Sequence, residues 1–587
     1  MLEQNLSIKN SWVPEKPKKP RFYYAILFGV LILYALIAYQ YFGLGALTNL
    51  KSKVVGTFRW EDFFDQMPYI WCLKWWPYAF THHLNPFITD YVWTPTGYNL
   101  AASPATLLSL SILTWPLQKL FGVLVVYNLL AIFTPALAAW TMFILCWWLI
   151  KRPVPAFLGG YLFGFSTYTV AHSQVVHFGL YAAIFLIPLI ILIALKFLKH
   201  EIKPLIFIVL TTLLFTFFFL TISEVFVTFS FCYFLAFLLA LLICIEDRER
   251  LKKLGLYTFL SYLLTAILTS PLLWYYFTDK INGPTTVPTV GLTNDLIGFL
   301  FPTSNFLISS ANFLQNIHFH LGVDSYLGIP LLVLIFFAIR NWNIRICKLL
   351  IILFFIFLII SLGPLWIFNG HPVTSFFPNT IFYSLPIFKY ALPMRYWLYS
   401  TFILALIAVV WIKDSSVYSW RTILVVISCL FIIPSYDRLN YGYSINQTNN
   451  PPFFVSQDLK KILTPGENIL ILPYSGKNSN GLDLWYQVES NFYFKMSQGF
   501  VGVFPLAVQT RIPHAWVSSI YIGLFGDQLS IIKIPEFIDY LKKHEIRDIV
   551  VLDSAYLEWQ PILTELPLKS PVHIDGVRVY SVATNYI

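Results

Sequence analysis

The sequence has few charged residues for its length. They make up 12% of its 587 residues, and hydrophobic residues make up 57%. A soluble globular protein has about 25% charged residues. This composition excludes an ordinary soluble domain and indicates an integral membrane protein with many spans.

Cysteine is also scarce, and the cysteines are not arranged in pairs. The chain has 6 of them, mostly inside apolar runs, with no CxxC spacing. We therefore expect neither a zinc site nor a disulfide framework. A signal-peptide pattern is missing as well, because residues 1–21 are polar and precede the first long apolar run. We expect residues 1–21 to form a cytoplasmic tail and that first run to stay as an anchor.

The net charge of +10 does not predict a nucleic-acid partner. The basic residues lie in short clusters between the apolar runs, such as "KPKKPR" and "EDRERLKK". Such clusters are typical of the loops on the cytoplasmic side of a membrane protein. We therefore interpret the basic residues as topology signals, with the N-terminus in the cytoplasm.

Apolar runs of roughly 20 residues, long enough to cross a bilayer, predict about eleven transmembrane helices between residues 22 and 435. They lie near 22–44, 123–150, 155–173, 178–198, 203–222, 223–245, 254–278, 323–340, 347–363, 391–412 and 419–435. The segment 103–121 is short and contains two prolines. A crossing there would turn the later basic clusters outward, so we expect it to be interfacial or paired in a hairpin.

Four segments share the predicted outer side of the membrane. They are the large first loop 45–122, the loops 279–322 and 364–390, and the chain after about residue 436.

Residues 436–587 differ from the rest, because strand-like runs at 468–474 and 547–553 alternate with an amphipathic helix at 534–546. This pattern predicts a small extracytoplasmic α/β domain. Its aromatic residues over 487–505 suit either stacking on sugar rings or the core of the domain.

The first loop carries "DQMPYIWCLKWWPYAFTHHLNPF" from Asp65 onward. Bulky residues recur at helical spacing from Trp60 to Tyr78, which predicts a helix with one aromatic face. We expect that face to lie in the lipid headgroups. Asp65 precedes the helix, where an acid is either a cap or a catalytic group. His82 and His83 are adjacent, so both cannot face one site on a helix.

Several segments together resemble a known family. They are "WCLKWWPYAFTHHLNPF", "WTPTGYNL", "GGYLFGFSTYTVAHSQVVH" (159–177), "LIGFLFPT" (296–303), "YLGIPLL" (326–332) and "SLPIFKYALPMRYW" (384–397). In order along the chain, they resemble the bacterial polytopic glycosyltransferases of the GT-C fold, relatives of the protein mannosyltransferases and aminoarabinose transferases. The resemblance implies transfer of a sugar, with inversion, from a polyprenyl-phosphate donor. The acceptor would be an extracytoplasmic glycan, lipid or protein at the outer face of the bacterial inner membrane.

The resemblance also implies the acids of the site. Asp65 matches the first-loop acid and would be the general base for the acceptor hydroxyl, with Glu61 and Asp62 as nearby substitutes. Glu224 in "LTISEVFVTF" is the second acid, as a supporting acid or metal partner. An ionisable group in such apolar sequence is a functional candidate, although the start of a helix is the structural alternative.

Four basic or imidazole side chains are candidates for binding the donor phosphate. Arg395 can take two phosphate oxygens at once, and Lys389 lies nearby in the sequence. The alternative for Arg395 is snorkelling to the membrane interface. His172 and His177 do not share a helical face if the helix continues, but a break between them would bring them together.

The metal requirement and the function class stay open at this level. Members of the fold differ in their need for a divalent cation such as Mg²⁺ or Mn²⁺, and the outer-loop group His318, His320 and Asp324 is either a ligand set or ordinary loop surface. A transporter or flippase of a lipid-linked glycan is the alternative function, although the sequence shows no internal repeat. A non-catalytic membrane assembly factor is the third reading.

Overall fold

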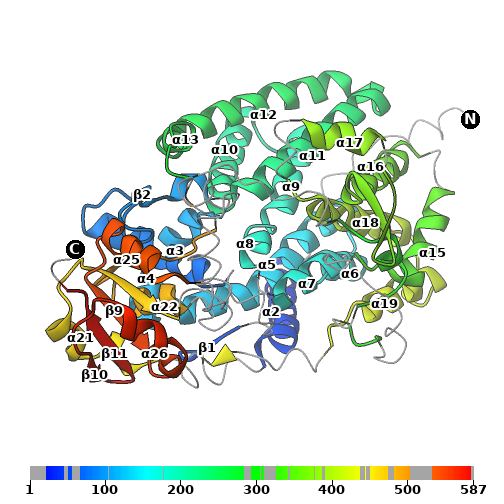
Figure 1. Cartoon of the computed structure of the whole chain (residues 1–587). Helices are drawn as coiled ribbons and strands as arrows, with labels where there is room; N and C mark the ends of the chain where they lie inside the picture. Colours follow the sequence, from blue (N-terminus) through cyan, green and yellow to red (C-terminus); the bar gives the residue numbers. More distant parts are fainter. Residues whose placement is uncertain are drawn as a thin grey trace, which may run out of the picture.

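The computed structural model describes most of the chain. The described residues are 22–44, 50–55, 66–103, 105–175, 177–282, 293–303, 306–309, 325–340, 344–375, 377–385, 391–435, 443–444, 450–473, 482–502, 505 and 532–583. Helices make up most of this part, and a mixed sheet with its own helices follows near the C-terminus (Figure 1).

The helices before residue 436 are α2 (Tyr23–Ala38), α3 (Gln66–Thr81), α4 (Leu108–Phe121), α5 (Val123–Ile150), α6 (Pro153–Gly164), α7 (Thr167–Val175), α8 (Phe178–Tyr181), α9 (Leu186–Leu198), α10 (Pro204–Thr221), α11 (Ser223–Ile243), α12 (Arg248–Leu268), α13 (Ser270–Phe277), α15 (Gly328–Ile339), α16 (Arg345–Ser361), α17 (Phe377–Ser384), α18 (Trp397–Ile412) and α19 (Trp420–Phe431). A π-helical turn, Tyr39–Gly43, extends α2, and the 3-10 turn η8 (Pro393–Tyr396) leads into α18.

Seven helices of the described residues are long and apolar enough to cross a membrane. They are Tyr23–Gly43, Val123–Ile150, Phe178–Leu198, Pro204–Thr221, Ser223–Ile243, Ile245–Leu268 and Pro393–Ile412. Two shorter apolar helices, α15 and α19, also coincide with predicted spans. The protein is therefore a multi-pass membrane protein, and the total of about eleven spans stays a prediction.

The predicted span 155–173 is wrong as a single helix. It is divided into α6, which ends at Gly164, and α7, which begins at Thr167. Between them, the Ser166 hydroxyl accepts a hydrogen bond from the Thr169 N–H at 3.4 Å. A serine that caps a new helix directly after the end of another divides the run, which a window of mean apolarity does not detect.

The basic loops gather at one end of the helices, as the positive-inside pattern predicted. Arg152 donates to the carbonyl oxygens of Lys413 at 2.5 Å and Ser415 at 2.8 Å. Arg345 forms an ion pair with Glu246 at 2.8 Å. Loops that are far apart in the sequence are thereby joined on one side of the helical bundle.

The segment 103–121 contains α4, a helix of 14 residues. Gly122, at φ +88°, separates α4 from α5, so the two helices form a tight pair. Helix α4 packs against α3 and α5. It is not one of the helices of the described residues that are long and apolar enough to cross a membrane. This arrangement agrees with the predicted interfacial or hairpin segment.

The C-terminal part contains a five-stranded mixed sheet in the order β10-β11-β9-β7-β8. Its strands and helices are α21 (Gln457–Ile462), β7 (Asn468–Leu472), α22 (Leu482–Glu489), β8 (Lys495–Met496), α25 (Ile534–Lys543), β9 (Asp548–Leu552), α26 (Tyr556–Glu565), β10 (Val572–Ile574) and β11 (Val577–Ser581). Strand β7 is parallel to β8 and β9, and β11 is antiparallel to β9 and β10. The two predicted strands and the predicted helix correspond to β7, β9 and α25.

Three short pairs of strands lie outside this sheet in the part of the chain that the structure describes. Strand β2 (Ile88–Thr89) pairs with β3 (Tyr98–Asn99), and β4 (Leu365–Phe368) pairs with β5 (His371–Ser375). Strand β1 (Lys53–Val54) of the first loop pairs with β6 (Tyr443–Ser444), which follows the last helix α19.

The aromatic face of α3 does not lie in lipid headgroups, so that expectation is wrong. Trp71 and Trp75 are at most 1% exposed. Their rings are stacked 5.1 Å apart, and each lies 5.5 Å from Phe492 of the C-terminal part. A local pattern specifies an apolar face but not what covers it, and here the cover is protein.

Hydrogen bonds fix the C-terminal part to the first loop as well. Trp71 Nε1 donates to Gln487 Oε1 at 2.7 Å, and Gln487 Nε2 donates to the carbonyl oxygen of Tyr91 at 2.8 Å. The N–H groups of Trp93 and Thr94 donate to the carbonyl oxygens of residues 498 and 496. Figure 1 shows α22 beside α3, and the two helices are in contact.

Candidate functional site

Two charged side chains from separate helices meet at the end of the bundle opposite the basic loops. Glu224 lies in the first turn of α11, and Arg395 lies in η8, directly before α18. They form an ion pair, and their side chains are 17% and 15% exposed. A charged pair this deep requires good mutual geometry, because removing either partner leaves a buried charge.

The two candidate histidines also lie together. Helix α7 ends at Val175, so the chain does break between His172 and His177. The His177 N–H donates to the His172 carbonyl oxygen at 3.1 Å, and the ring centroids are 5.6 Å apart. The break in the helix therefore brings His172 and His177 together, which is the alternative that the sequence left open.

Buried polar groups that have no hydrogen-bond partner among the described residues lie near Arg395 or next to it in the sequence. Tyr168, His172 and Tyr396 are fully buried. Among the described residues, no group hydrogen-bonds to the Tyr168 or Tyr396 hydroxyl or to either His172 ring nitrogen. The Tyr168 and His172 rings are 4.3 Å apart, and both lie close enough to Arg395 for its charge to act on them. Unsatisfied buried groups cost about 1–3 kcal/mol each, so this cluster is suited to a polar ligand.

Sequence reasoning did not single out Tyr168 or Tyr396. A tyrosine in an apolar run is usually part of the core, with its hydroxyl bonded to a neighbour. The signal that could have found them is their position inside two of the family-like segments, 159–177 and 384–397.

Other hydrogen bonds hold the helices of the site in place. Trp397 Nε1 donates to Thr167 Oγ1 at 3.1 Å, which joins α18 to α7. The Tyr399 hydroxyl interacts with Thr228 Oγ1 at 2.7 Å and donates to the Val225 carbonyl oxygen at 3.1 Å, which joins α18 to α11. These bonds join α18 to α7 and α11 close in sequence to Arg395 and Glu224.

The start of α3 lies beside the histidines. The Tyr69 ring is 6.2 Å from that of Phe178, the first residue of α8. A Cβ atom on Gly179 would lie 2.9 Å from the Tyr69 ring and 3.0 Å from the Ala105 side chain, so only glycine fits this approach. Helix α3 is thus in close contact with the segment that carries His177.

Several candidates named from the sequence lie outside the described residues. They are Glu61, Asp62, Asp65, Lys389, His318, His320 and Asp324. Helix α3 begins at Gln66, directly after Asp65. His82 and His83 are described and are exposed. No group of three or more His, Cys, Asp or Glu side chains within the described ranges could hold a metal ion.

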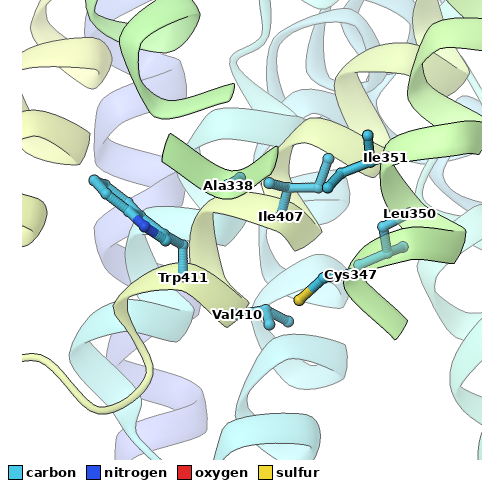
Figure 2. Close-up of a pocket in the computed structure, with 7 residues that line it drawn as sticks. All are labelled: Ala338, Cys347, Leu350, Ile351, Ile407, Val410 and Trp411. Atoms are coloured by element: carbon cyan, nitrogen blue, oxygen red, sulfur yellow. The ribbon is translucent and has the colours of Figure 1, made fainter. Parts of the chain in front are cut away.

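A pocket between α15, α16 and α18 is unsuited to phosphate chemistry. Figure 2 shows that its labelled lining residues, among them Cys347, Ile407 and Trp411, are all apolar. Trp411 lies near the end of α18 that leads to Lys413. The pocket therefore belongs to the basic end of the bundle and not to the cluster around Arg395.

No protein-family model matches the sequence, and no curated protein matches it either. Solved structures do match. The archaeal oligosaccharyltransferase AglB from Archaeoglobus fulgidus, in complex with an inhibitory peptide and a dolichol-phosphate, matches with a TM-score of 0.52 at 10% identity, over 97% of this chain and 75% of that chain. Its apo form matches with a TM-score of 0.54 at 11% identity, over 96% and 75%.

The arabinofuranosyltransferase AftD from Mycobacteria is similar as well. Its TM-score is 0.54 at 12% identity, over 95% of this chain but only 41% of that longer chain. Identities this low show the fold alone. The protein is therefore a multi-pass membrane protein with a GT-C-like fold, which agrees with the resemblance found in its sequence.

Proposed function

We propose that the protein is a membrane glycosyltransferase that moves a sugar from a polyprenyl-phosphate donor to an acceptor outside the cytoplasm. The observation that carries this proposal is the largely buried Arg395–Glu224 pair in a GT-C-like fold, with Tyr168 and His172 nearby, whose polar atoms have no hydrogen-bond partner among the described residues. An arginine in a mostly buried cluster of hydrogen-bonding groups is suited to a phosphate ester.

The reaction needs no further reactant. The acceptor hydroxyl oxygen bonds to the anomeric carbon, and the bond from that carbon to the phosphate oxygen breaks with inversion. The electron pair stays on the phosphate, and the hydroxyl proton goes to a base. Polyprenyl phosphate leaves as the second product.

Each residue has a proposed role in this reaction. Arg395 binds the donor phosphate, with His172 and His177 beside it and Lys389 as a further cation. Asp65, directly before α3, is the general base, with Glu61 and Asp62 as substitutes.

Glu224 is proposed as the partner of Arg395, because the ion pair gives it that contact. A metal role for Glu224 has no such support among the described residues.

The location of the reaction is part of the proposal. A polyprenyl tail stays in hydrocarbon while its phosphate lies at the membrane surface, so the site must be at one end of the helices. The cluster lies opposite the basic loops, which would face the cytoplasm. Residues 22–435 would form the membrane domain, and residues 436–587 would form an outer domain on the bacterial inner membrane.

The test is sugar transfer by purified protein in nanodiscs from a panel of radiolabelled polyprenyl-phosphate sugars, with and without EDTA. We expect wild-type turnover, its loss in Asp65→Asn at unchanged thermal stability, and its loss in Arg395→Gln, which also leaves the Glu224 charge without its partner. Arg345→Gln is the matched control, because it breaks an ion pair at the opposite end of the helices and should keep activity. Movement of a lipid-linked sugar across liposomes, without transfer from any donor, would instead support the transporter alternative.

A further inference from the structure

The charge balance at Arg395 suggests how the site treats its substrate and its product. Glu224 pairs with Arg395, and both side chains are largely buried. The Tyr168 hydroxyl, which lies near Arg395, can provide a hydrogen bond without adding charge. The pair formed by Glu224 and Arg395 therefore contributes no net charge to the place where a phosphate would bind.

We propose that Glu224 sets the charge preference of this site, so that a singly charged phosphodiester binds as well as a doubly charged phosphomonoester. The inference rests on the proposed function and extends it to product release. The donor is a phosphodiester with one negative charge. Breaking its sugar–phosphate bond leaves a phosphomonoester, which carries a charge of about −1.5 to −2 at pH 7.

An arginine without a carboxylate beside it would hold the product more tightly than the donor, because attraction grows with the charge on the phosphate. The guanidinium has five N–H donors, so it can contact the Glu224 carboxylate and a phosphate at the same time. The two anions then lie across one guanidinium, and their repulsion is larger for the phosphomonoester. Because the Arg395 and Glu224 side chains are largely buried, solvent ions screen the repulsion between Glu224 and the phosphate only weakly.

The inference can be tested by binding, without knowing the sugar. The probes are farnesyl phosphate, a monoester, and farnesyl methyl phosphate, a diester with the same chain. We expect wild-type protein in detergent to bind the two with dissociation constants within about threefold. Glu224→Gln removes one negative charge, so it should favour the monoester by about tenfold or more.

Two variants separate charge from other effects. Glu224→Asp keeps the carboxylate and should keep the wild-type ratio. Glu246→Gln is the matched control, because it neutralises an acid paired with Arg345 at the opposite end and should change neither affinity. In the transfer assay, Glu224→Gln should show about tenfold stronger inhibition by polyprenyl phosphate.

An unchanged ratio in Glu224→Gln would overturn the inference. A strong preference of the wild-type protein for the monoester would overturn it as well, and that measurement needs no variant to fold. Arg395→Gln tests the phosphate site separately, because it should weaken both probes. If Arg395→Gln weakens the binding of both probes and Glu224→Gln leaves the ratio of their dissociation constants unchanged, the result supports the phosphate site at Arg395 and contradicts only the proposed role of Glu224.

Discussion

Replacing Tyr168 with phenylalanine removes one hydroxyl from the candidate site and leaves the ring in place. That hydroxyl is buried, lies near Arg395 and has no hydrogen-bond partner among the described residues. The deletion therefore breaks no described contact. Tyr399 provides a matched control, because its hydroxyl is also buried but interacts with Thr228 at 2.7 Å and Val225 at 3.1 Å.

The two substitutions should have opposite effects. An unsatisfied buried hydroxyl costs about 1–3 kcal/mol, so Tyr168→Phe should leave stability unchanged or raise it. A hydrogen bond from this hydroxyl to a phosphate is worth about 1.5–3 kcal/mol, which predicts farnesyl phosphate binding about 10- to 150-fold weaker. Tyr399→Phe should lower the free energy of unfolding by about 1–2 kcal/mol and change the affinity by less than about threefold.

The assay is farnesyl phosphate binding to each purified variant, together with the midpoint of thermal unfolding without ligand. Normal binding by Tyr168→Phe, with a fall in midpoint as large as that of Tyr399→Phe, would refute the reasoning. It would mean that the Tyr168 hydroxyl has a structural partner and does not bind the ligand.

Three further predictions concern the support of the site and the C-terminal sheet. Gln487→Leu should lower the free energy that holds the C-terminal part on the first loop by about 2–4 kcal/mol, because the Trp71 N–H and the carbonyl oxygens of Tyr91 and Phe494 lose their buried partner. Faster limited proteolysis after residue 435 would show this loss, and unchanged proteolysis would contradict it. Gly179→Val should displace α3 and lower the free energy of unfolding by at least about 2 kcal/mol. An unchanged midpoint of thermal unfolding would contradict the close contact between Gly179 and the Tyr69 ring. Burial, and a hydrogen bond that the protonated Asp548 carboxyl donates to the Glu467 carboxylate, raise the pKa of Asp548 to about 7. The folded sheet therefore binds a proton that the unfolded chain releases near pH 4. Stability should therefore fall as pH rises from 5 to 7, by at most about 1.4 kcal/mol per unit, and Asp548→Asn should flatten this dependence; a midpoint that rises over this range would contradict the assignment.

Much of the candidate site was accessible from residue types and local position. The sequence indicates Glu224, because an acid amid apolar residues is unusual, and Arg395, because a guanidinium suits phosphate. The structure brings these two together with His172 and His177. The tyrosine hydroxyls were missed, because whether a hydroxyl has a partner depends on residues from other helices.

The sequence by itself determined that the protein crosses a membrane many times, which end of the helices carries the basic loops, and the two strands β7 and β9 of the C-terminal sheet. These follow from apolar length, charge clusters and residue alternation, which are local properties. Only the tertiary structure decided that the α3 aromatics are covered by residues such as Phe492, and that Glu224 pairs with Arg395. Both are contacts between distant segments. A local pattern specifies that a face must be covered or a charge compensated, whereas the folded chain determines which residue does so.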